Sequence, residues 1–319
     1  MRLPLLIALL VLLIGGAGGS VWYWKEQQLA VPNQLDAPKI MIVERGWGVI
    51  RIASELRQKG IITEDWVFRE VVRRKGLATR LRAGEFEFQP GWTAAQVAEH
   101  LTRGAAVEHK VTIPEGLTST EIAALLNADM RMSGPEVEPP PEGTVLPETL
   151  TFIRGVHRPH MLELLRKMQS DTLMELWSRR VDDLPIKTPE EAVILASIVE
   201  KETGVAEERR KVAGVFINRL NKGMRLQSDP TVIYSITKGQ RPLGRPLTRA
   251  DWRFESDWNT YRNKGLPPTP IAAPGRASLE AVLNPEQHDY LFFVADGTGG
   301  HAFAKTYDDH RANIRKYQR

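Results

Sequence analysis

The longest apolar stretch of the chain lies at its start. Arg2 is followed by residues 3–24, which are apolar except for small residues, and Trp22 and Trp24 stand at the far end. A bilayer-spanning helix needs about 20 apolar residues, and tryptophan is enriched at membrane interfaces. We therefore expect residues 1–25 to form a cytoplasmic stub and a single transmembrane helix. A cleaved signal peptide is the alternative, because the small residues of this run could serve as a cleavage site.

Beyond this segment, short alternating runs are interleaved with amphipathic periodicity, which predicts an α+β fold. We predict strands at 41–43, 82–88 and 111–113, and helices at 49–59, 64–75, 94–101 and 118–127. Thr63 and Thr93 are the expected N-caps of the second and third helices. Residues 26–110 are therefore expected to form a small module of their own.

The second part of the chain, residues 111–319, also has the pattern of an α+β domain. Prolines and glycines between residues 133 and 144 predict an irregular loop. After it we predict helices at 159–178, 188–203, 207–222 and 278–283, a strand at 291–294, a return strand from His301 and a closing helix.

The helix that begins at Thr188 has the clearest signals in the chain. Thr188 is a good N-cap, Pro189 suits the first helical position, and Glu191 is placed to complete a capping box with Thr188. Residues 192–199 are apolar nearly all round, which predicts a buried helix. Gly204 is expected to stop it.

Two glutamates close this helix, and their spacing separates them. Glu202 lies on the same face as Leu195 and Ile198, so it continues an apolar stripe. Glu200 points the opposite way, toward water or a basic partner. A partly buried carboxyl has a raised pKa and can donate a proton near neutral pH, so Glu202 is the better candidate acid. The plain alternative is that both glutamates form a solvated last turn.

Composition excludes several kinds of chemistry. The chain has no cysteine, which rules out disulfides, thiolate metal sites and a cysteine nucleophile. A net charge of +4 is too small to indicate nucleic-acid binding. The seven histidines are scattered, and neither a nucleophile elbow nor a phosphate-binding loop is found. We expect no cofactor, no metal and no nucleic-acid partner.

Polar residues gather at two places after the buried helix. Gln227, Ser228, Asp229 and Thr231 cluster on a predicted turn before an apolar run, which suits a sugar-binding rim or an ordinary Asp-Pro turn. Asn259 and Tyr261 lie in an irregular stretch whose amide, hydroxyl and ring suit acetamido sugars. Asn218 falls among apolar neighbours in its helix, which favours an amide that bridges core elements.

Several runs, in order and close together, resemble one family. They are Ser197–Thr203, Val215–Leu220, Met224–Tyr234, Asn259–Tyr261, Gly265–Pro268 and Val294–Gly297. These residues resemble the endolytic murein transglycosylases, the MltG or YceG-like family. The resemblance covers essentially the whole chain and is strongest from about residue 186 onward.

The resemblance implies a fold, a reaction and a set of site residues. It implies a LysM-like module at 26–110, which binds glycan or serves only as a spacer, followed by a lysozyme-like mixed α+β catalytic domain at 111–319. It implies cleavage of the MurNAc–GlcNAc β-1,4 bond within nascent strands, with 1,6-anhydro-MurNAc formation by one glutamate, Glu202, acting as acid and then base. The implied substrate-binding residues are Thr203, Asn218, Gln227, Ser228, Asp229, Thr231, Tyr234, Asn259 and Tyr261, with Glu200 as the runner-up acid.

The resemblance also implies a location and partners. We expect a single-pass protein of the inner (cytoplasmic) membrane with its catalytic domain in the periplasm. Peptidoglycan glycan strands are the expected substrate and peptidoglycan synthases are candidate partners. Two other functions stay open. One is a hydrolytic muramidase, with Asp229 or Glu200 holding a water. The other is a non-catalytic glycan-binding scaffold.

Overall fold

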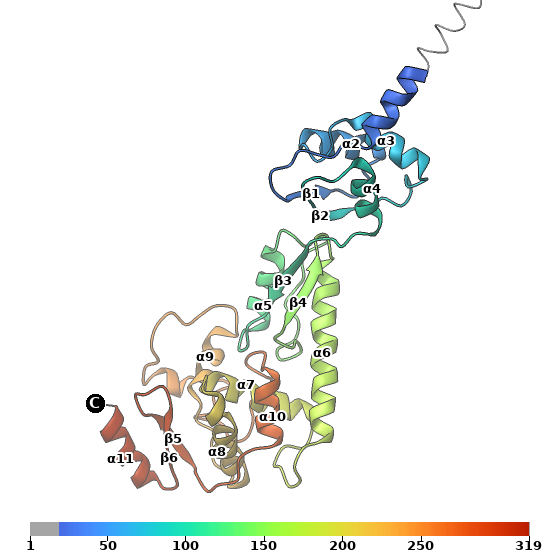
Figure 1. The fold of residues 1–319 in the computed structure, drawn as a ribbon. Helices are drawn as coiled ribbons and strands as arrows, with labels where there is room; N and C mark the ends of the chain where they lie inside the picture. Colours follow the sequence, from blue (N-terminus) through green and yellow to red (C-terminus); the bar gives the residue numbers. More distant parts are fainter. Residues whose placement is uncertain (1–18, 319) are drawn as a thin grey trace, which may run out of the picture. The chain divides into compact units, whose positions relative to one another are not determined.

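The computed structural model of the protein describes residues 19–318, which form an α+β fold with three two-stranded sheets (Figure 1). The α+β class predicted from the sequence is therefore confirmed. The chain divides into two compact units. Unit 1 contains the described residues up to His109 together with Thr151–Gly155, and unit 2 contains Lys110–Leu150 and the residues from Val156 onward. The functions assigned to residues 26–110 and 111–319 remain predictions.

The predicted transmembrane helix falls mainly on residues 1–18, which lie outside the described residues. Residues 19–29 are helical. More than half of the surface of Trp22 and of Trp24 is exposed to solvent. None of the helices within residues 19–318 has the length and apolar character needed to cross a bilayer.

Unit 1 is built on one antiparallel strand pair covered by helices. Strand β1 (Lys39–Val43) pairs with β2 (Gly84–Phe88), with Met41 opposite Phe86. The helices are α2 (Val49–Gln58), α3 (Asp65–Arg74) and α4 (Ala94–Arg103). Thr93 forms the predicted cap of α4 as a full capping box. The predicted cap Thr63 is wrong, because α3 begins one residue later and Glu64 occupies the N-cap position.

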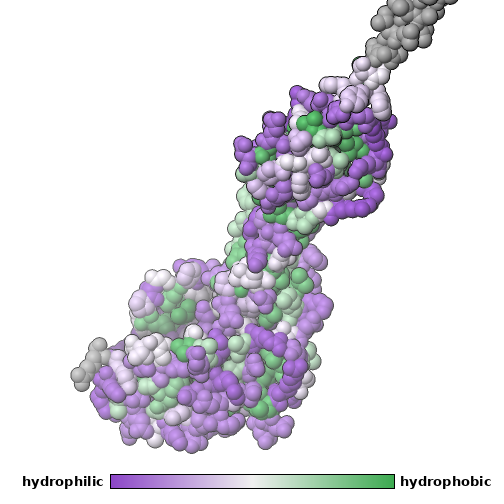
Figure 2. Space-filling view, viewed as in Figure 1, coloured by the Kyte–Doolittle hydropathy of each residue, from purple (hydrophilic) through white to green (hydrophobic). Residues whose placement is uncertain are grey.

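Unit 2 is mainly helical. The α-helices and strands that lie entirely in unit 2 are α5 (Ser119–Ala128), α6 (Arg158–Ser178), α7 (Pro189–Glu202), α8 (Arg209–Asn221), α9 (Asp229–Thr237), α10 (Arg276–Leu283), β5 (Phe292–Ala295), β6 (His301–Ala304) and α11 (Tyr307–Tyr317). Strands β3 (Glu108–Thr112) and β4 (Thr149–Ile153) have residues in the ranges of both units. Strands β3 and β4 pair, and β5 and β6 form an antiparallel hairpin. Helix α7 packs against α8, α9 and α10. Figure 2 shows a mainly polar surface with scattered apolar areas, as is usual for a globular domain.

Helix α7 is the buried helix that the sequence predicts. Every residue from Ala192 to Val199 is buried. The Thr188 side chain accepts a hydrogen bond from the Glu191 backbone N–H at 3.2 Å, as an N-cap should. The predicted second bond of the capping box, from the Thr188 backbone N–H to the Glu191 carboxylate, is wrong. The Glu191 carboxylate instead accepts from the backbone N–H of Lys187, one residue earlier.

The predicted polar turn at residues 227–231 is only partly a turn. Ser228 is the N-cap of α9, and Asp229, Pro230 and Thr231 form its first turn. The physical reason is that serine favours the N-cap, while proline and an acidic residue favour the first helical turn. Helix α9 therefore fixes the side chain of Asp229 at a helix start instead of on a free loop.

Candidate active site

A cavity of about 480 Å³ lies beside the C-terminal end of α7, within unit 2. Two carboxyl residues line it, Glu202 from the last position of α7 and Asp229 from the first turn of α9. Tyr261, Phe293 and His301 contribute aromatic rings to its wall. The cavity therefore combines acid groups with ring faces, which is the usual composition of a pocket for a carbohydrate or another amphipathic ligand.

The environment of Glu202 makes it a weak acid. Burial and, to a smaller extent, the negative charge of Asp229 raise the pKa of Glu202 to about 7. Ser228 Oγ is buried without a well-formed hydrogen bond, but its proximity lowers the pKa of Glu202, as do the guanidinium charge of Arg219 and the imidazole of His301 whenever that ring is protonated. The net result is a carboxyl that is substantially protonated at neutral pH, which is what a general acid requires.

Asp229 is held in place by two side-chain donors. Trp252 Nε1–H donates to Asp229 Oδ1 at 2.9 Å, and Tyr261 O–H donates to the same oxygen at 2.7 Å. Burial and the bond to Asp229 raise the pKa of Tyr261, so its phenol stays a hydrogen-bond donor. The two rings lie 6.0 Å apart and pack beside the carboxylate. The carboxylate consequently has a fixed direction next to Glu202.

Two predicted site residues support this arrangement from behind and do not line the cavity. Asn259 Nδ2 donates to the carbonyl oxygens of Trp252 at 3.2 Å and Phe254 at 2.8 Å, while its Oδ1 accepts from Tyr261 N–H at 3.0 Å. Thr231 Oγ1 donates to Ser228 O at 2.6 Å and lies 2.8 Å from Thr260 Oγ1. Both are buried and act as struts for the residues that face the cavity.

Gln227 lines the cavity in an unusual backbone conformation. Its φ is 51°, in the left-handed region that non-glycine residues rarely occupy. A bond from Gln227 N–H to Thr260 O at 3.2 Å holds it there. Backbone strain of this kind costs on the order of 1 kcal/mol. The contact of Gln227 with a substrate stays a prediction.

Three other predicted residues are placed elsewhere. Thr203 Oγ1 accepts from Val205 N–H at 3.0 Å and closes the turn after α7. Asn218 Nδ2 donates to the backbone oxygens of His288 at 2.7 Å and Tyr290 at 3.0 Å, which is the bridging amide favoured by its pattern. Tyr234 is half-buried on α9, where burial raises its pKa to about 12. We therefore do not place these three side chains against a ligand in this cavity.

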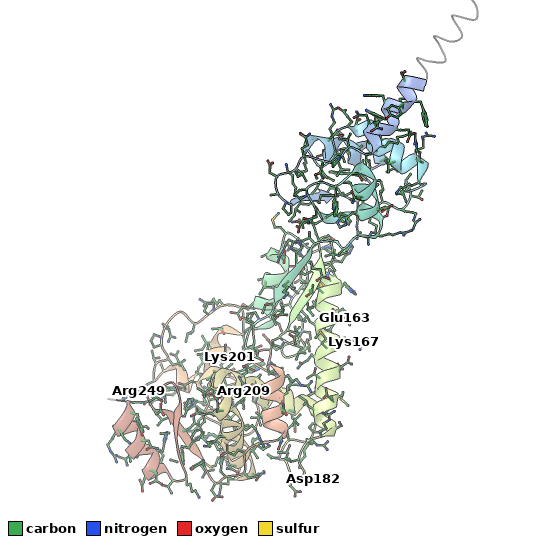
Figure 3. The ribbon with its side chains drawn as sticks, in the orientation of Figure 1. Glu163, Lys167, Asp182, Lys201, Arg209 and Arg249 are labelled. Carbon is green, nitrogen blue, oxygen red and sulfur yellow. The ribbon has the colours of Figure 1, made fainter. Side chains whose placement is uncertain are left out.

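The runner-up acid, Glu200, faces a different environment. Its Oε2 accepts from Gly275 N–H at 2.9 Å, and its Oε1 is 3.9 Å from Arg209 Nη2. Only 6% of its side chain is exposed. Lys201 and Arg209, labelled in Figure 3, lie around this end of α7, and Lys201 Nζ donates to Gly116 O at 3.0 Å. Glu200 is thus tied to a basic partner and a backbone N–H and is not part of the cavity wall.

Sequence reasoning missed Arg219, among other residues of the cavity wall, and left His301 open. Arg219 on α8 is 7% exposed, and it donates from Nε to Leu291 O at 2.6 Å and from Nη1 to Leu226 O at 2.5 Å. Arg219 lies on the apolar face of the helix predicted at residues 207–222. A basic residue on an apolar face is the feature of the sequence that could have identified it. His301 is predicted at the start of a return strand, with its reach into the cleft left open, and it lines the cavity.

A larger cavity, of about 860 Å³, lies against α6 and the start of α7. Its one partly buried carboxyl with a raised pKa, within the described residues, is Glu142. Both bonds of Glu142 go to Ser119, whose N–H and Oγ donate at 3.0 and 3.1 Å. This glutamate serves the start of α5. We therefore assign the chemistry to the smaller cavity.

The smaller cavity defines a class of site. A carboxyl with a pKa of about 7 beside a second, fixed carboxyl and an aromatic wall is an acid–base site of the kind that cleaves glycosidic bonds. The family model described as the YceG-like family matches residues 41–316. The chain therefore belongs to the YceG-like family.

Individual relatives agree with this assignment. The chain is 29% identical to an endolytic murein transglycosylase of Bacillus subtilis, with 94% of this chain and 90% of the relative covered. It is 27% identical to the endolytic murein transglycosylase of Streptococcus pneumoniae R6, with 97% of this chain but only 64% of that longer relative covered. A crystal structure of a YceG-like protein of Listeria monocytogenes is similar with a TM-score of 0.51 at 28% identity, covering 86% of this chain and 98% of the other.

Proposed function

We propose that this protein is an endolytic murein transglycosylase, which cleaves the MurNAc–GlcNAc β-1,4 bond within peptidoglycan strands and leaves a 1,6-anhydro-MurNAc end. The observation that carries the proposal is Glu202, a carboxyl with a pKa of about 7 at the rigid end of a buried helix and in a cavity wall. The names of the Bacillus and Streptococcus relatives support the same reaction and substrate.

In the proposed reaction the substrate supplies its own nucleophile. Protonated Glu202 gives its proton to the glycosidic oxygen as the bond from that oxygen to C1 of the muramoyl residue breaks. The C6 hydroxyl of the same sugar attacks C1 and closes the anhydro ring. The hydroxyl proton returns to the Glu202 carboxylate, so the enzyme ends as it began. Asp229, fixed by Trp252 and Tyr261, offers negative charge to the cationic sugar that forms during bond breaking.

The setting of this reaction is also part of the proposal. We infer an inner-membrane protein whose N-terminal segment anchors it and whose catalytic domain lies in the periplasm. Exposed Trp22, Tyr23 and Trp24 support a position of residues 19–29 at a membrane surface. There the enzyme would meet nascent strands beside peptidoglycan synthases and limit their length, with the LysM-like module as a glycan contact or a spacer.

A hydrolytic muramidase is the second candidate. The observation in its favour is that two carboxyls, Glu202 and Asp229, line one cavity, because a hydrolase needs one carboxyl as acid and another as base or nucleophile. The two reactions use the same acid and differ in whether water or the C6 hydroxyl reaches C1.

The test is an analysis of product ends. The full-length protein would be incubated with uncrosslinked glycan strands, and the fragments would be identified by mass spectrometry over time. Internal fragments with anhydro ends are expected from the first time points. Reducing ends alone would establish a hydrolase, and intact strands bound by a folded protein would favour the scaffold.

A further inference from the structure

A histidine–glutamate pair lies in the same cavity wall as Glu202. His301, the first residue of β6, lines the cavity. Its Nδ1 is 2.7 Å from Glu208 Oε2, and its backbone N–H donates to Glu208 Oε1 at 3.0 Å. Glu208 is the last residue of the 3₁₀ turn η1 (Ala206–Glu208), which follows α7. Both oxygens of the Glu208 carboxylate are thus bound to His301, which fixes the direction of its imidazole ring.

The bond to Glu208 determines which nitrogen of the His301 ring can act as a hydrogen-bond acceptor. A carboxylate can only accept hydrogen bonds, so Nδ1 of His301 must carry the hydrogen. In a neutral imidazole the other nitrogen, Nε2, is then an acceptor. Within residues 19–318, Nε2 has no hydrogen-bond partner. Phe293 packs edge-on at 5.3 Å and supplies no competing polar group.

No step of the reaction described above uses this pair. Yet a nitrogen acceptor, oriented by a carboxylate and open to a cavity, has the form of a general base with its orienting group. The carboxyls that interact with His301 are Glu208 from η1, Glu202 from α7 and Asp296 from the turn between β5 and β6, and the Asp296 carboxylate already accepts from Thr298. Of these, Glu208 alone is hydrogen-bonded to the ring.

We propose that His301 is a catalytic residue whose Nε2 accepts the proton of the C6 hydroxyl of the muramoyl residue. Glu208 is the residue that positions the His301 ring. This inference rests on the proposed function and assigns the two proton transfers of that reaction to two different residues. Glu202 protonates the leaving oxygen. As O6 bonds to C1, the hydroxyl proton moves to Nε2, and the resulting imidazolium, stabilised by Glu208, passes the proton to the Glu202 carboxylate. No other reactant is needed, and His301 selects the sugar hydroxyl over water.

The measurement is the ratio of anhydro to reducing ends, because a merely structural role would not change which nucleophile reaches C1. In full-length His301→Phe we expect the ratio to fall by about tenfold or more, since the hydroxyl loses its acceptor while Glu202 still cleaves the bond. His301→Gln places an amide oxygen near the position of Nε2 and should restore part of the ratio. Glu208→Leu should lower the ratio less than His301→Phe does.

The matched control is His310→Phe. His310 on α11 lines the same cavity and stacks on Phe292 at 5.1 Å, but no carboxylate among the described residues 19–318 is hydrogen-bonded to its ring. Its replacement should leave the ratio of product ends at the wild-type value, whatever the change in rate.

The outcomes separate this inference from the proposed function. Wild type that yields only reducing ends would end the proposed function itself. Wild type with anhydro ends, and a folded His301→Phe with the same ratio, would overturn the inference and leave the function standing. If His301→Phe does not fold, a wild-type ratio in both His301→Gln and Glu208→Leu would overturn it equally.

Discussion

Two carboxyls two residues apart at the end of α7 have opposite surroundings. Glu202 lies in a cavity wall near a second carboxylate, and its pKa is raised to about 7. Glu200 is also largely buried, but it is paired with Arg209 and accepts a backbone hydrogen bond from Gly275. Burial of a carboxyl therefore does not by itself make an acid catalyst. A compensating partner ties one glutamate into the structure, and the lack of a sufficient one raises the pKa of the other.

The largest expected effect separates the two residues directly. Glu202→Gln removes the transferable proton, and we expect kcat/KM for strand cleavage to fall by about a thousandfold. The measurement is the initial rate of formation of anhydro ends by mass spectrometry. Retention of more than a tenth of the activity would show that another group is the acid.

The control for this variant is its stability. The pKa of Glu202 is higher in the folded than in the unfolded protein, so the folded state binds this proton more tightly. The protein therefore loses stability as the pH rises from about 4.5 through about 7. Above pH 7 the buried charge destabilises wild type, and the neutral Glu202→Gln should be more stable by on the order of 2 kcal/mol. Thermal unfolding at pH 8 should therefore show a higher Tm for the inactive variant.

The second effect is the pH dependence of wild type. The acid form of Glu202 must be present, so kcat/KM should decline above pH 7 by about tenfold for each pH unit. Rates measured between pH 5 and 9 at constant ionic strength would locate this limb. A decline that begins near pH 5 would instead point to a carboxyl with an ordinary pKa, such as one in full contact with water.

A smaller effect should follow from Asp229→Asn. The Asp229 charge raises the pKa of Glu202, so its removal should move the declining limb to lower pH and reduce kcat/KM at pH 7 by several-fold. An asparagine oxygen can still accept from Trp252 and Tyr261, which keeps the geometry. An unchanged limb with a large loss of kcat would show that Asp229 acts mainly through the charge it offers the cationic sugar and not through the pKa of Glu202.

The smallest effect on activity is expected for Glu200→Gln. This change leaves the mostly buried Arg209 without its charge partner and should lower the free energy of unfolding by about 1–3 kcal/mol. The kcat/KM of the folded enzyme should stay at the wild-type value. Chemical unfolding and strand cleavage would be measured on the same preparation. A stable but inactive variant would reverse the roles of the two glutamates.

Local patterns in the sequence were sufficient for most helices and for the distinction between Glu200 and Glu202. Capping residues and apolar periodicity determine where α7 begins and which face it buries, and both are local properties. The stripe that contains Leu195 and Ile198 also leads to the cavity wall at Glu202. This part of the site could be predicted because one helix carries it.

The rest of the site depends on contacts between distant segments. Asp229 receives its two donors from residues 23 and 32 positions further along the chain, and His301 receives Glu208 from 93 positions earlier. No spacing rule connects such residues. Asn259 and Thr231 illustrate the resulting error, since their polar side chains suggest ligand contacts but form buried struts. For Ser-Asp-Pro at residues 228–230, the helix-start signal was present and was outweighed by the turn interpretation.

The bond between Trp252 and Asp229 gives the site an optical property of its own. An indole whose N–H is bonded to a carboxylate emits light with a wavelength and yield that depend on that bond and on the surrounding water. Because Asp229 lines the cavity, a sugar that contacts its carboxylate would alter this bond, and the part of the intrinsic fluorescence change that is lost in Trp252→Phe would report occupancy without an attached dye. Binding and bond cleavage can then be timed separately in one stopped-flow trace.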